Sequence, residues 1–565
     1  MSGRLPVVLL WHMHQPQYCD ALTGEYTQPW TALHALKDYS DMAAHLEDNP
    51  AARAVVNFTP VLIEQLEALA LQVRAHLGIG AALLDPVLAS LVGTLPAEPE
   101  ARLALVRALL RAQRAQMIEP LPAYRELVDI AALLATPARI AYVSDAFIRD
   151  LSVWYHLAWT GETIRRRDAR VAALMARARD FTTDDRRALL AVIGDTLASI
   201  IPRYRALAAA GRCELSVSPY SHPILPLLCD FAAARESLPA SPLPRHAGYA
   251  GGRERADWHM GEAVRVFERA FGARPVGCWP SEGAISHAAL EVIDRHGFAW
   301  VASSAGVLRA SLDARSGEVA WAADALDRPY RLPGQRLQCW FRDDGLSDLV
   351  GFTYSTWHGD DAVAHLVAAL VELAARHGDS PGHAVLIALD GENAWEHYPQ
   401  NGYHFLRALY AALATHPQLE LTTLGALSAR ESLPPALLPH VRAGSWVHST
   451  LATWIGDADK NAAWDLLCEA KLAFDRVVAG GALVGESLAA ARRQLAQCES
   501  SDWFWWFGDY NPAEAVAQFD LLFRRQLTVL YRMLALEPPA ELGQPVSRGG
   551  GSMEHGGVMR RAHDD

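Results

Sequence analysis

Short, continuous apolar runs alternate along the chain with long stretches of helical periodicity. The runs predict strands at residues 6–10, 53–58, 213–217, 276–279, 299–303, 384–389 and 419–423. Because these runs are apolar throughout instead of at every second position, both faces of the predicted sheet must be buried, as when helices cover a parallel sheet. The pattern predicts an α/β fold, and about seven strands with helices between them favour a barrel over an open, doubly wound sheet.

Two long regions have a helical pattern and no strand between their helices. Residues 61–210 are rich in Ala, Leu and Arg and are too long for one crossover helix, so we expect an inserted helical subdomain. After about residue 430 the strand pattern stops and helical periodicity returns. The predicted organisation is a barrel domain at 1–430, a C-terminal helical domain at 431–545 that contributes to the cleft, and a disordered tail at 546–565.

Charge and composition exclude several kinds of partner. The 565 residues have a net charge of −13, which argues against nucleic acid or an anionic membrane, whose phosphates require a basic surface. No run reaches the roughly 18 apolar residues that span a bilayer. The N-terminal run 6–11 is too short for a signal peptide, and the seven cysteines lack a CxxC spacing, so we expect a cytoplasmic protein with reduced thiols.

Polar and aromatic residues follow four of the predicted strands. These segments are Trp11–Tyr18, Ser218–Pro223, Cys278–Gly283 and Asp390–Glu396. In parallel α/β folds the loops after the strands converge on one face, and ligands bind there. The composition of these segments therefore predicts a site at the carboxyl ends of the strands.

Glu282 and Asp390 are the candidate catalytic pair. Each lies one to three residues past an apolar run. Two carboxyl groups across a barrel mouth suit glycosidic bond cleavage, in which one attacks or stabilises the anomeric carbon and the other protonates the leaving oxygen. Trp279 and Trp395 would supply apolar surroundings and platforms for sugar rings. The alternative from the residues alone is that both acids are helix caps or loop ion pairs.

His12 and His14 invite a metal interpretation. Residues at i and i+2 of a strand end face the same side and could bind one ion, with His222 or Asp390 as a third ligand. The alternative is that these histidines form hydrogen bonds with a polar ligand or a nearby carboxylate. No third and fourth ligand follow at a motif spacing, so we assign no metal.

The segment from Ser501 to Tyr510 contains a dense group of aromatic residues. Some of them are expected to form a buried seam between the helical domain and the barrel, while others, with Asp502, would face the cleft. Trp446 belongs to the same region. Phosphate-binding and nucleophile-elbow motifs are absent from the sequence, so a carbohydrate ligand explains this mixture of aromatic and acidic residues best.

Five ordered motifs resemble those of glycoside hydrolase family 57. They are His12-Met13-His14-Gln15-Pro16, Gly211-Arg212-Cys213-Glu214-Leu215, Trp279-Pro280-Ser281-Glu282-Gly283, Leu389-Asp390-Gly391-Glu392-Asn393-Ala394-Trp395-Glu396 and Ser501-Asp502-Trp503-Phe504-Trp505-Trp506. The resemblance implies an incomplete (β/α)7 barrel followed by a helical domain, and a retaining mechanism on α-glucans without a metal or other cofactor. It implies Glu282 as nucleophile and Asp390 as general acid/base. The predicted substrate contacts are His12, His14, Gln15, Glu214, His222, Trp279, Glu392, Trp395, Trp446, Asp502 and Trp503.

The sequence therefore predicts a retaining glycoside hydrolase on α-1,4-glucans, similar to an α-amylase. A 4-α-glucanotransferase or amylopullulanase would use the same residues, so the sequence does not separate hydrolysis from transfer. Two other hypotheses are a metal-dependent mannosidase or deacetylase and an inactive glucan-binding protein. The last is suggested by Ser303-Ser304-Ala305, where relatives often have an acidic residue.

Overall fold

Seven parallel strands form the central sheet of the computed structural model, which describes residues 4–134, 136–313, 324–377 and 382–551. Their spatial order is β7-β5-β4-β3-β2-β1-β8. The bounds are β1 Leu5–Met13, β2 Ala54–Phe58, β3 Cys213–Val217, β4 Gly277–Cys278, β5 Trp300–Ser304, β7 Gln338–Arg342 and β8 Val385–Asp390. The two outer strands approach each other, because the Asp343 N–H donates to Leu386 O at 2.8 Å. Among the described residues no strand ladder joins β7 to β8, so the barrel is incomplete, as predicted.

One of the predicted strands lies beside the barrel, and one barrel strand was not predicted. The run at 419–423 forms β9 (Leu419–Thr422), which pairs with the first half of β1 beside the barrel path. The seventh strand of the barrel is β7 instead. Its apolar stretch covers only Cys339–Phe341, between Gln338 and Arg342, which is too short to predict a strand. Two further pairs of residues, β6 (Tyr330–Arg331) and β10 (Ala436–Leu437), extend the sheet beyond β7. The sequence missed them because two residues show no periodicity.

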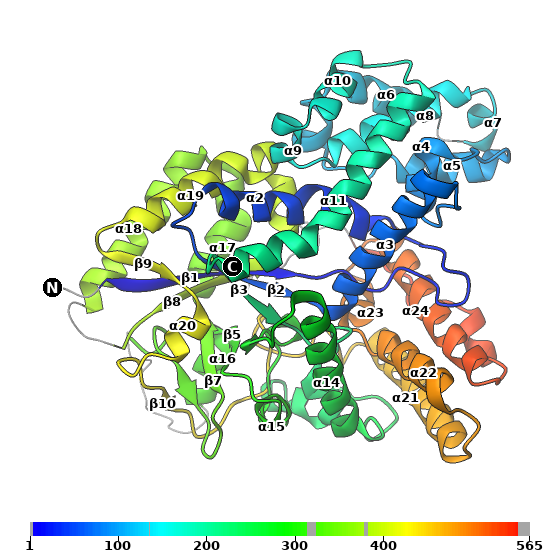
Figure 1. The fold of residues 1–565 in the computed structure, drawn as a ribbon. Helices are drawn as coiled ribbons and strands as arrows, with labels where there is room; N and C mark the ends of the chain where they lie inside the picture. Colours follow the sequence, from blue (N-terminus) through cyan, green and yellow to red (C-terminus); the bar gives the residue numbers. More distant parts are fainter. Residues whose placement is uncertain (1–3, 135, 314–323, 378–381, 552–565) are drawn as a thin grey trace.

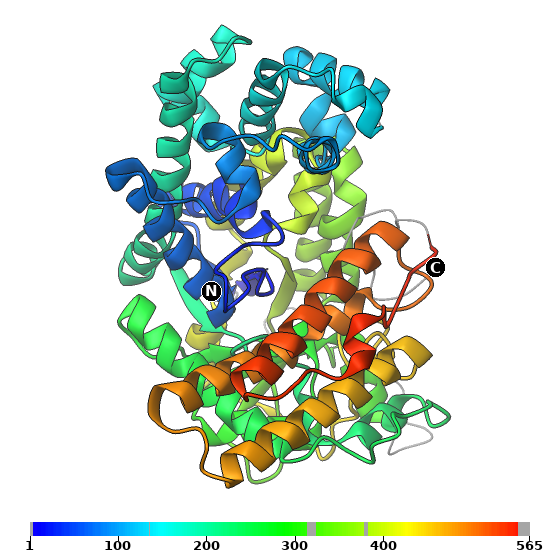
Figure 2. The same ribbon diagram turned by 90° about the vertical axis from the view of Figure 1, so that its right-hand side faces the viewer.

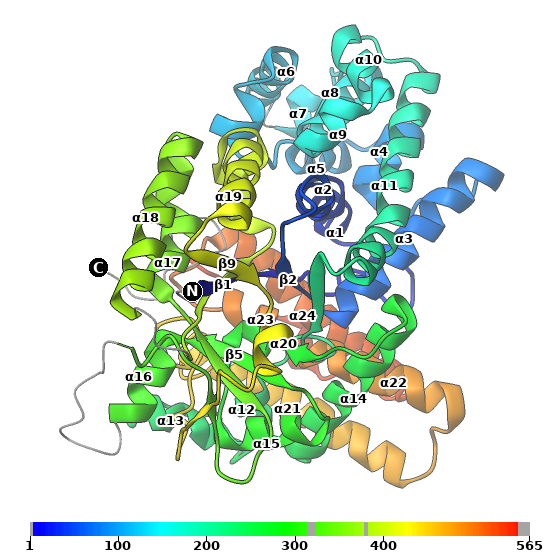
Figure 3. The same cartoon turned by 60° about the vertical axis from the view of Figure 1, so that its left-hand side comes forward.

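Helices cover both faces of the sheet, and β1 is accordingly buried from Val7 to Trp11. In Figure 3, α18 and α19 lie side by side next to β9. The helices of the barrel part are α1 Trp30–His34, α2 Ser40–Asp48, α12 Leu225–Cys229, α13 Ala234–Ser237, α14 Gly252–Phe271, α15 His287–Arg295, α16 Ala305–Asp313, α17 Asp344–Asp348, α18 Gly359–His377, α19 Tyr403–Thr415 and α20 Leu424–Ser428. In the described part of the chain, none of the helices is long and apolar enough to cross a bilayer.

Between β2 and β3 the chain is helical, with α4 to α10 gathered at one end of the molecule (Figure 1). The bounds are α3 Pro60–Ile79, α4 Pro86–Val92, α5 Pro99–Ala108, α6 Pro122–Leu133, α7 Pro137–Ile140, α8 Asp145–Ala158, α9 Glu162–Arg167, α10 Ala169–Arg177 and α11 Thr183–Ala209. The long α11 returns the chain to the sheet. It begins at a capping box, in which Thr182 and Asp185 satisfy each other's backbone N–H groups.

The C-terminal helices pack beside the barrel next to α14 (Figures 1 and 2). They are α21 Ala458–Ala479, α22 Gly485–Cys498, α23 Ser501–Trp506 and α24 Ala513–Met533. Aromatic contacts hold them together: the rings of Trp464 and Phe504 stack at 4.3 Å between centroids. At the start of the tail predicted to be disordered, the N–H groups of Val546 and Ser547 donate to Asp520 Oδ1. Residues 552–565 lie outside the described residues.

Candidate active site

Glu282 lies in a tight turn just after β4. The one-turn helix Ser281–Gly283 contains it in a left-handed conformation, with φ 58° and ψ 25°. A bulky residue at positive φ is strained, and such strain concentrates at functional sites. Trp446 clamps the turn, because its Nε1–H donates to Glu282 Oε2 at 2.9 Å and its backbone N–H donates to Glu282 O at 3.0 Å.

Asp390 is the last residue of β8, at the same end of the sheet. In the parallel register it is opposite His12 of β1. The Asn393 amide donates to Asp390 Oδ2 at 3.1 Å. In the described part of the chain, neither Asp390 nor Glu282 forms an ion pair with a basic residue, so both carboxyl groups are available to a ligand.

The two acids share one electrostatic environment. Burial raises the pKa of Glu282 to about 8, and the negative charge of Asp390 raises it further, while the Trp446 N–H opposes the shift. Burial also raises the pKa of Asp390, against the opposing effects of Asn393, His14 and Arg342. Two interacting carboxyl groups titrate as a pair, so this pair holds one proton well above the usual range for carboxylic acids.

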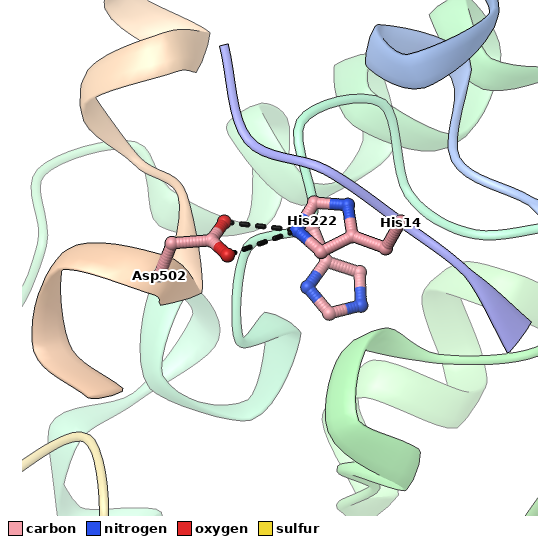
Figure 4. Close-up of side chains that lie close together, drawn as sticks. All are labelled: His14, His222 and Asp502. Atoms are coloured by element: carbon pink, nitrogen blue, oxygen red, sulfur yellow. Dashed lines mark hydrogen bonds and ion pairs between the residues drawn. The ribbon is translucent and has the colours of Figure 1, made fainter. Parts of the chain in front are cut away.

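Beside the acids, three histidines form a compact stack. The rings of His14 and His222 have centroids 3.9 Å apart, and His12 lies 5.0 Å from His222. In Figure 4, Asp502 of α23 points at His14, whose Nε2 is 2.9 Å from Asp502 Oδ2. The C-terminal helical region therefore places a carboxylate against the histidine stack.

Hydrogen bonds fix which ring nitrogens are protonated. Asn57 uses its amide N–H toward Ser216, so its Oδ1 faces His12 Nδ1 as an acceptor at 2.7 Å. His12 Nδ1 must then be the donor, and its Nε2 accepts from His222 Nε2–H at 3.1 Å. His222 Nδ1 in turn accepts from the Ser501 hydroxyl at 2.9 Å. Burial lowers the pKa of His12 to about 3 and that of His222 well below its usual value, so both rings are neutral.

This network bears on the metal hypothesis. The side chains that lie within ligand distance of one another are His14, His222 and Asp502, whereas His12 is outside this group. The lone pair of an imidazole lies in the ring plane, yet the His14 and His222 rings are stacked at an interplanar angle of 23° and cannot aim at one ion. His222 Nε2 also carries a proton. The residues fit a hydrogen-bond network, and they do not fit a bound metal in this arrangement.

Metal removal is therefore expected to leave activity unchanged. After dialysis against EDTA, kcat/KM should stay within about twofold of the untreated protein, because no ring nitrogen of the stack is free to bind an ion. Metal analysis by mass spectrometry on the same sample provides the control. Loss of activity that Zn²⁺ restores at one ion per chain would contradict the network.

Glu392 is buried behind the strand ends. Its Oε1 accepts hydrogen bonds from the His14 backbone N–H at 3.2 Å, from the Gln15 amide at 3.4 Å and from Tyr39 OH at 3.2 Å. Burial raises the pKa of Glu392 well above its usual value, and the charge of Asp390 adds to the shift. Glu392 therefore holds the backbone at His14, and the Gln15 side chain binds Glu392.

Four predicted contacts lie elsewhere or are covered. Glu214 is at the opposite end of the barrel, at the start of β3, where it accepts from Trp300 Nε1 at 2.6 Å and from the Gly425 N–H at 2.7 Å. Trp395 and Trp503 are buried in the core, with indole N–H groups that donate to the backbone of Gly391 and Gln497. Trp279 is fully buried beneath Trp446, with ring centroids 5.0 Å apart. It supports the site and offers no open face to a sugar.

A buried ionic cluster fixes the segment that presents Asp502. Glu499, three residues earlier, is fully buried and accepts from Arg255 Nη2 at 2.7 Å, His259 Nε2 at 2.7 Å and Tyr249 OH at 2.7 Å. Arg255 and His259 belong to α14 of the barrel part. The Ser501 N–H donates to His222 O at 3.0 Å, so the same segment is also bound to the histidine stack.

The model of glycosyl hydrolase family 57 matches residues 8–432. The chain belongs to this family. None of the curated proteins matches it in sequence.

Solved structures of the family share the fold along almost the whole chain. A branching enzyme from Thermococcus kodakaraensis is 16% identical, with a TM-score of 0.56 over 94% of this chain and 90% of that one. A branching enzyme from Pyrococcus horikoshii is 14% identical, with a TM-score of 0.55 over 98% of each chain. The α-amylase AmyC from Thermotoga maritima is 12% identical, with a TM-score of 0.55 over 94% of each chain.

This family 57 enzyme also has, around the site, residues that were not among the predicted substrate contacts. Asn57 and Ser501 fix the histidine tautomers, and Arg342 packs on Trp446. The unusual Ser303 and Ser304 are buried and support the turns of the site. Ser303 Oγ donates to Gly283 O at 2.6 Å, and Ser304 Oγ donates to Ser445 O at 3.2 Å. No motif spacing could reveal these partners, because each contact joins distant segments.

The paired carboxyl groups predict how activity of this glycoside hydrolase depends on pH. One group must be ionised and the other protonated, and a raised pKa means that the last proton of the pair is kept to higher pH. The raised pKa of about 8 at Glu282, in the presence of the Asp390 charge, means that the pair loses its last proton near pH 8; kcat/KM should fall above this pH, where neither acid can donate a proton, and also in acid, where both groups are protonated. Measurement from pH 4 to 10, with folding followed by circular dichroism, checks this. A constant rate between pH 7 and 10 would contradict it.

Proposed function

We propose that this chain is a retaining enzyme that cleaves α-1,4 bonds of α-glucans through a glycosyl-enzyme intermediate. The observation that supports the proposal most is the pair of partly buried, electrostatically coupled acids after β4 and β8. The family match and the names of the similar structures, which include branching enzymes, an α-amylase and a 4-α-glucanotransferase from Thermococcus litoralis, favour an α-glucan.

Glu282 is the nucleophile in this mechanism. Its carboxylate attacks the anomeric carbon while Asp390 donates a proton to the glycosidic oxygen, so the C–O bond breaks as the glycosyl-enzyme bond forms. The Trp446 N–H at Glu282 Oε2 stabilises the ionised carboxylate and leaves Oε1 for the attack.

Asp390 then acts as the base in the second step. It removes a proton from water or from a sugar hydroxyl, which attacks the anomeric carbon from the side that the leaving group vacated. The configuration is therefore retained. Water gives hydrolysis, and a sugar hydroxyl gives transfer. Both reactions use the same two acids.

Incubation with pure maltoheptaose tests the proposal. Shorter products alone indicate hydrolysis, and longer products in addition indicate 4-α-glucanotransfer. A parallel incubation with amylose, followed by proton NMR of the α-1,6 anomeric signals, detects branching. Absence of any product from both substrates would overturn the proposed function, and a binding assay on the same sample would then test a non-catalytic glucan-binding role.

A further inference from the structure

Arg342, at the end of β7, contacts both Trp446 and the end of β8 and is not among the residues predicted to act at the site. It is 5% exposed, so its charge is almost entirely removed from water. A buried guanidinium is stable only when its N–H groups are satisfied. Its Nε donates to Asp344 Oδ1 at 2.8 Å, and its Nη1 donates to Ala388 O at 2.9 Å.

The guanidinium reaches the Glu282 side of the site through Trp446. Its central carbon lies over the Trp446 ring, 4.8 Å from the ring centroid. The same indole donates its N–H to Glu282 Oε2. The position of the ring therefore depends on Arg342 on its face and on Glu282 at its edge.

The guanidinium reaches the Asp390 side through β8. Ala388, whose carbonyl it binds, is two residues before Asp390 on the same strand. Its charge is one of the influences that lower the pKa of Asp390 against the larger effect of burial. The other titratable groups around Asp390 are Glu282, Glu392, His14 and His12.

We propose that Arg342 is a positioning residue for both acids: it fixes the indole that holds Glu282, and it places a positive charge within reach of Asp390. This inference rests on the proposed function, because it assigns a role within that mechanism. The planar guanidinium is required, since one flat group must stack on Trp446 while its N–H groups bind Asp344 and Ala388.

Two variants separate geometry from charge. Arg342→Lys keeps the charge and loses the planar fork, so kcat should fall about 10- to 100-fold with KM little changed and the alkaline limb of the pH profile in place. Arg342→Gln removes the charge as well. The pKa of Asp390 then rises, so the alkaline limb should move up by about 0.5–1 pH unit in addition to the loss of kcat.

A double-variant cycle tests the route through Trp446. Trp446→Phe keeps an aromatic face and loses the N–H to Glu282. If Arg342 acts through the indole, Arg342→Lys combined with Trp446→Phe should lose no more kcat than the worse single variant. Losses that multiply, an unchanged kcat in Arg342→Lys, or an unmoved limb in Arg342→Gln would each overturn the inference.

Two safeguards keep the test decisive. Arg342→Gln leaves the buried Asp344 carboxylate without its cation. If this variant does not fold, the same measurement is made on Arg342→Gln combined with Asp344→Asn. The protonation of Asp390 is also read without turnover, from carbodiimide labelling against pH followed by peptide mass spectrometry. A wild-type protein that converts no α-glucan overturns the proposed function, whereas equal labelling profiles for wild type and Arg342→Gln overturn this inference alone.

Discussion

Replacement of Glu282 by glutamine is expected to lower kcat on maltoheptaose by about 10³- to 10⁵-fold, with oligosaccharide Kd within about threefold of the wild type. Glutamine has the shape of the carboxylate and can still accept the Trp446 N–H, so the turn at 281–283 keeps its support. It cannot form the glycosyl-enzyme bond. The measurements are kcat from product release and Kd from calorimetry.

Asp390→Ala separates the two roles. Loss of the acid should slow cleavage of an α-1,4 bond strongly, while an aryl α-maltoside with a good leaving group should retain a much larger fraction of its rate, since that bond needs little protonation. The Glu282 variant should be slow on both substrates. Reversal of this pattern would exchange the two assignments.

Glu214→Gln is the matched control, because Glu214 is also a buried carboxyl group of the barrel and has a raised pKa through burial. It lies at the opposite end of the strands, so the folded fraction of this variant should have kcat/KM within about threefold of the wild type. A loss comparable to that of Glu282→Gln would contradict the placement of the site.

The sequence predicted the strands well where burial makes them apolar throughout. β2, β3, β5 and β8 end within one residue of the predicted runs, and β1 continues three residues beyond its run. It failed at β7, where polar residues flank three apolar ones, and it put the run at 419–423 into the barrel. Strand order depends on contacts between distant segments, which local apolarity does not encode.

The sequence could predict those residues of the site that directly follow a strand. Glu282 and Asp390 follow β4 and β8, and the geometry of parallel strands brings them to one end. Glu214 was misplaced because it is at the start of its strand and faces the other end. For the histidines, residue type left metal binding and hydrogen bonding both open, and only the fold brings in the distant partners Ser501 and Asp502 that occupy their nitrogens.

Glu499→Gln, which replaces the buried carboxylate by an uncharged amide, is expected to lower the free energy of unfolding by about 3–5 kcal/mol. The change leaves the Arg255 guanidinium, with a side chain 8% exposed, without its carboxylate. The measurement is urea unfolding at pH 7. Tyr249→Phe, which removes only one hydrogen bond to Glu499, is the control and should cost about 1–2 kcal/mol.

The same carboxylate predicts an acid limit of stability. Burial alone would raise its pKa, but Arg255 and His259 hold the pKa of Glu499 at about 2, below its ordinary value of 4.5. A lowered folded pKa means that the stabilisation is fully present above about pH 4.5 and is lost as the pH falls toward 2. Wild-type stability should therefore decline over this interval more steeply than that of Glu499→Gln. Parallel pH dependences for the two proteins would show that the ion pair does not secure the segment that carries Asp502.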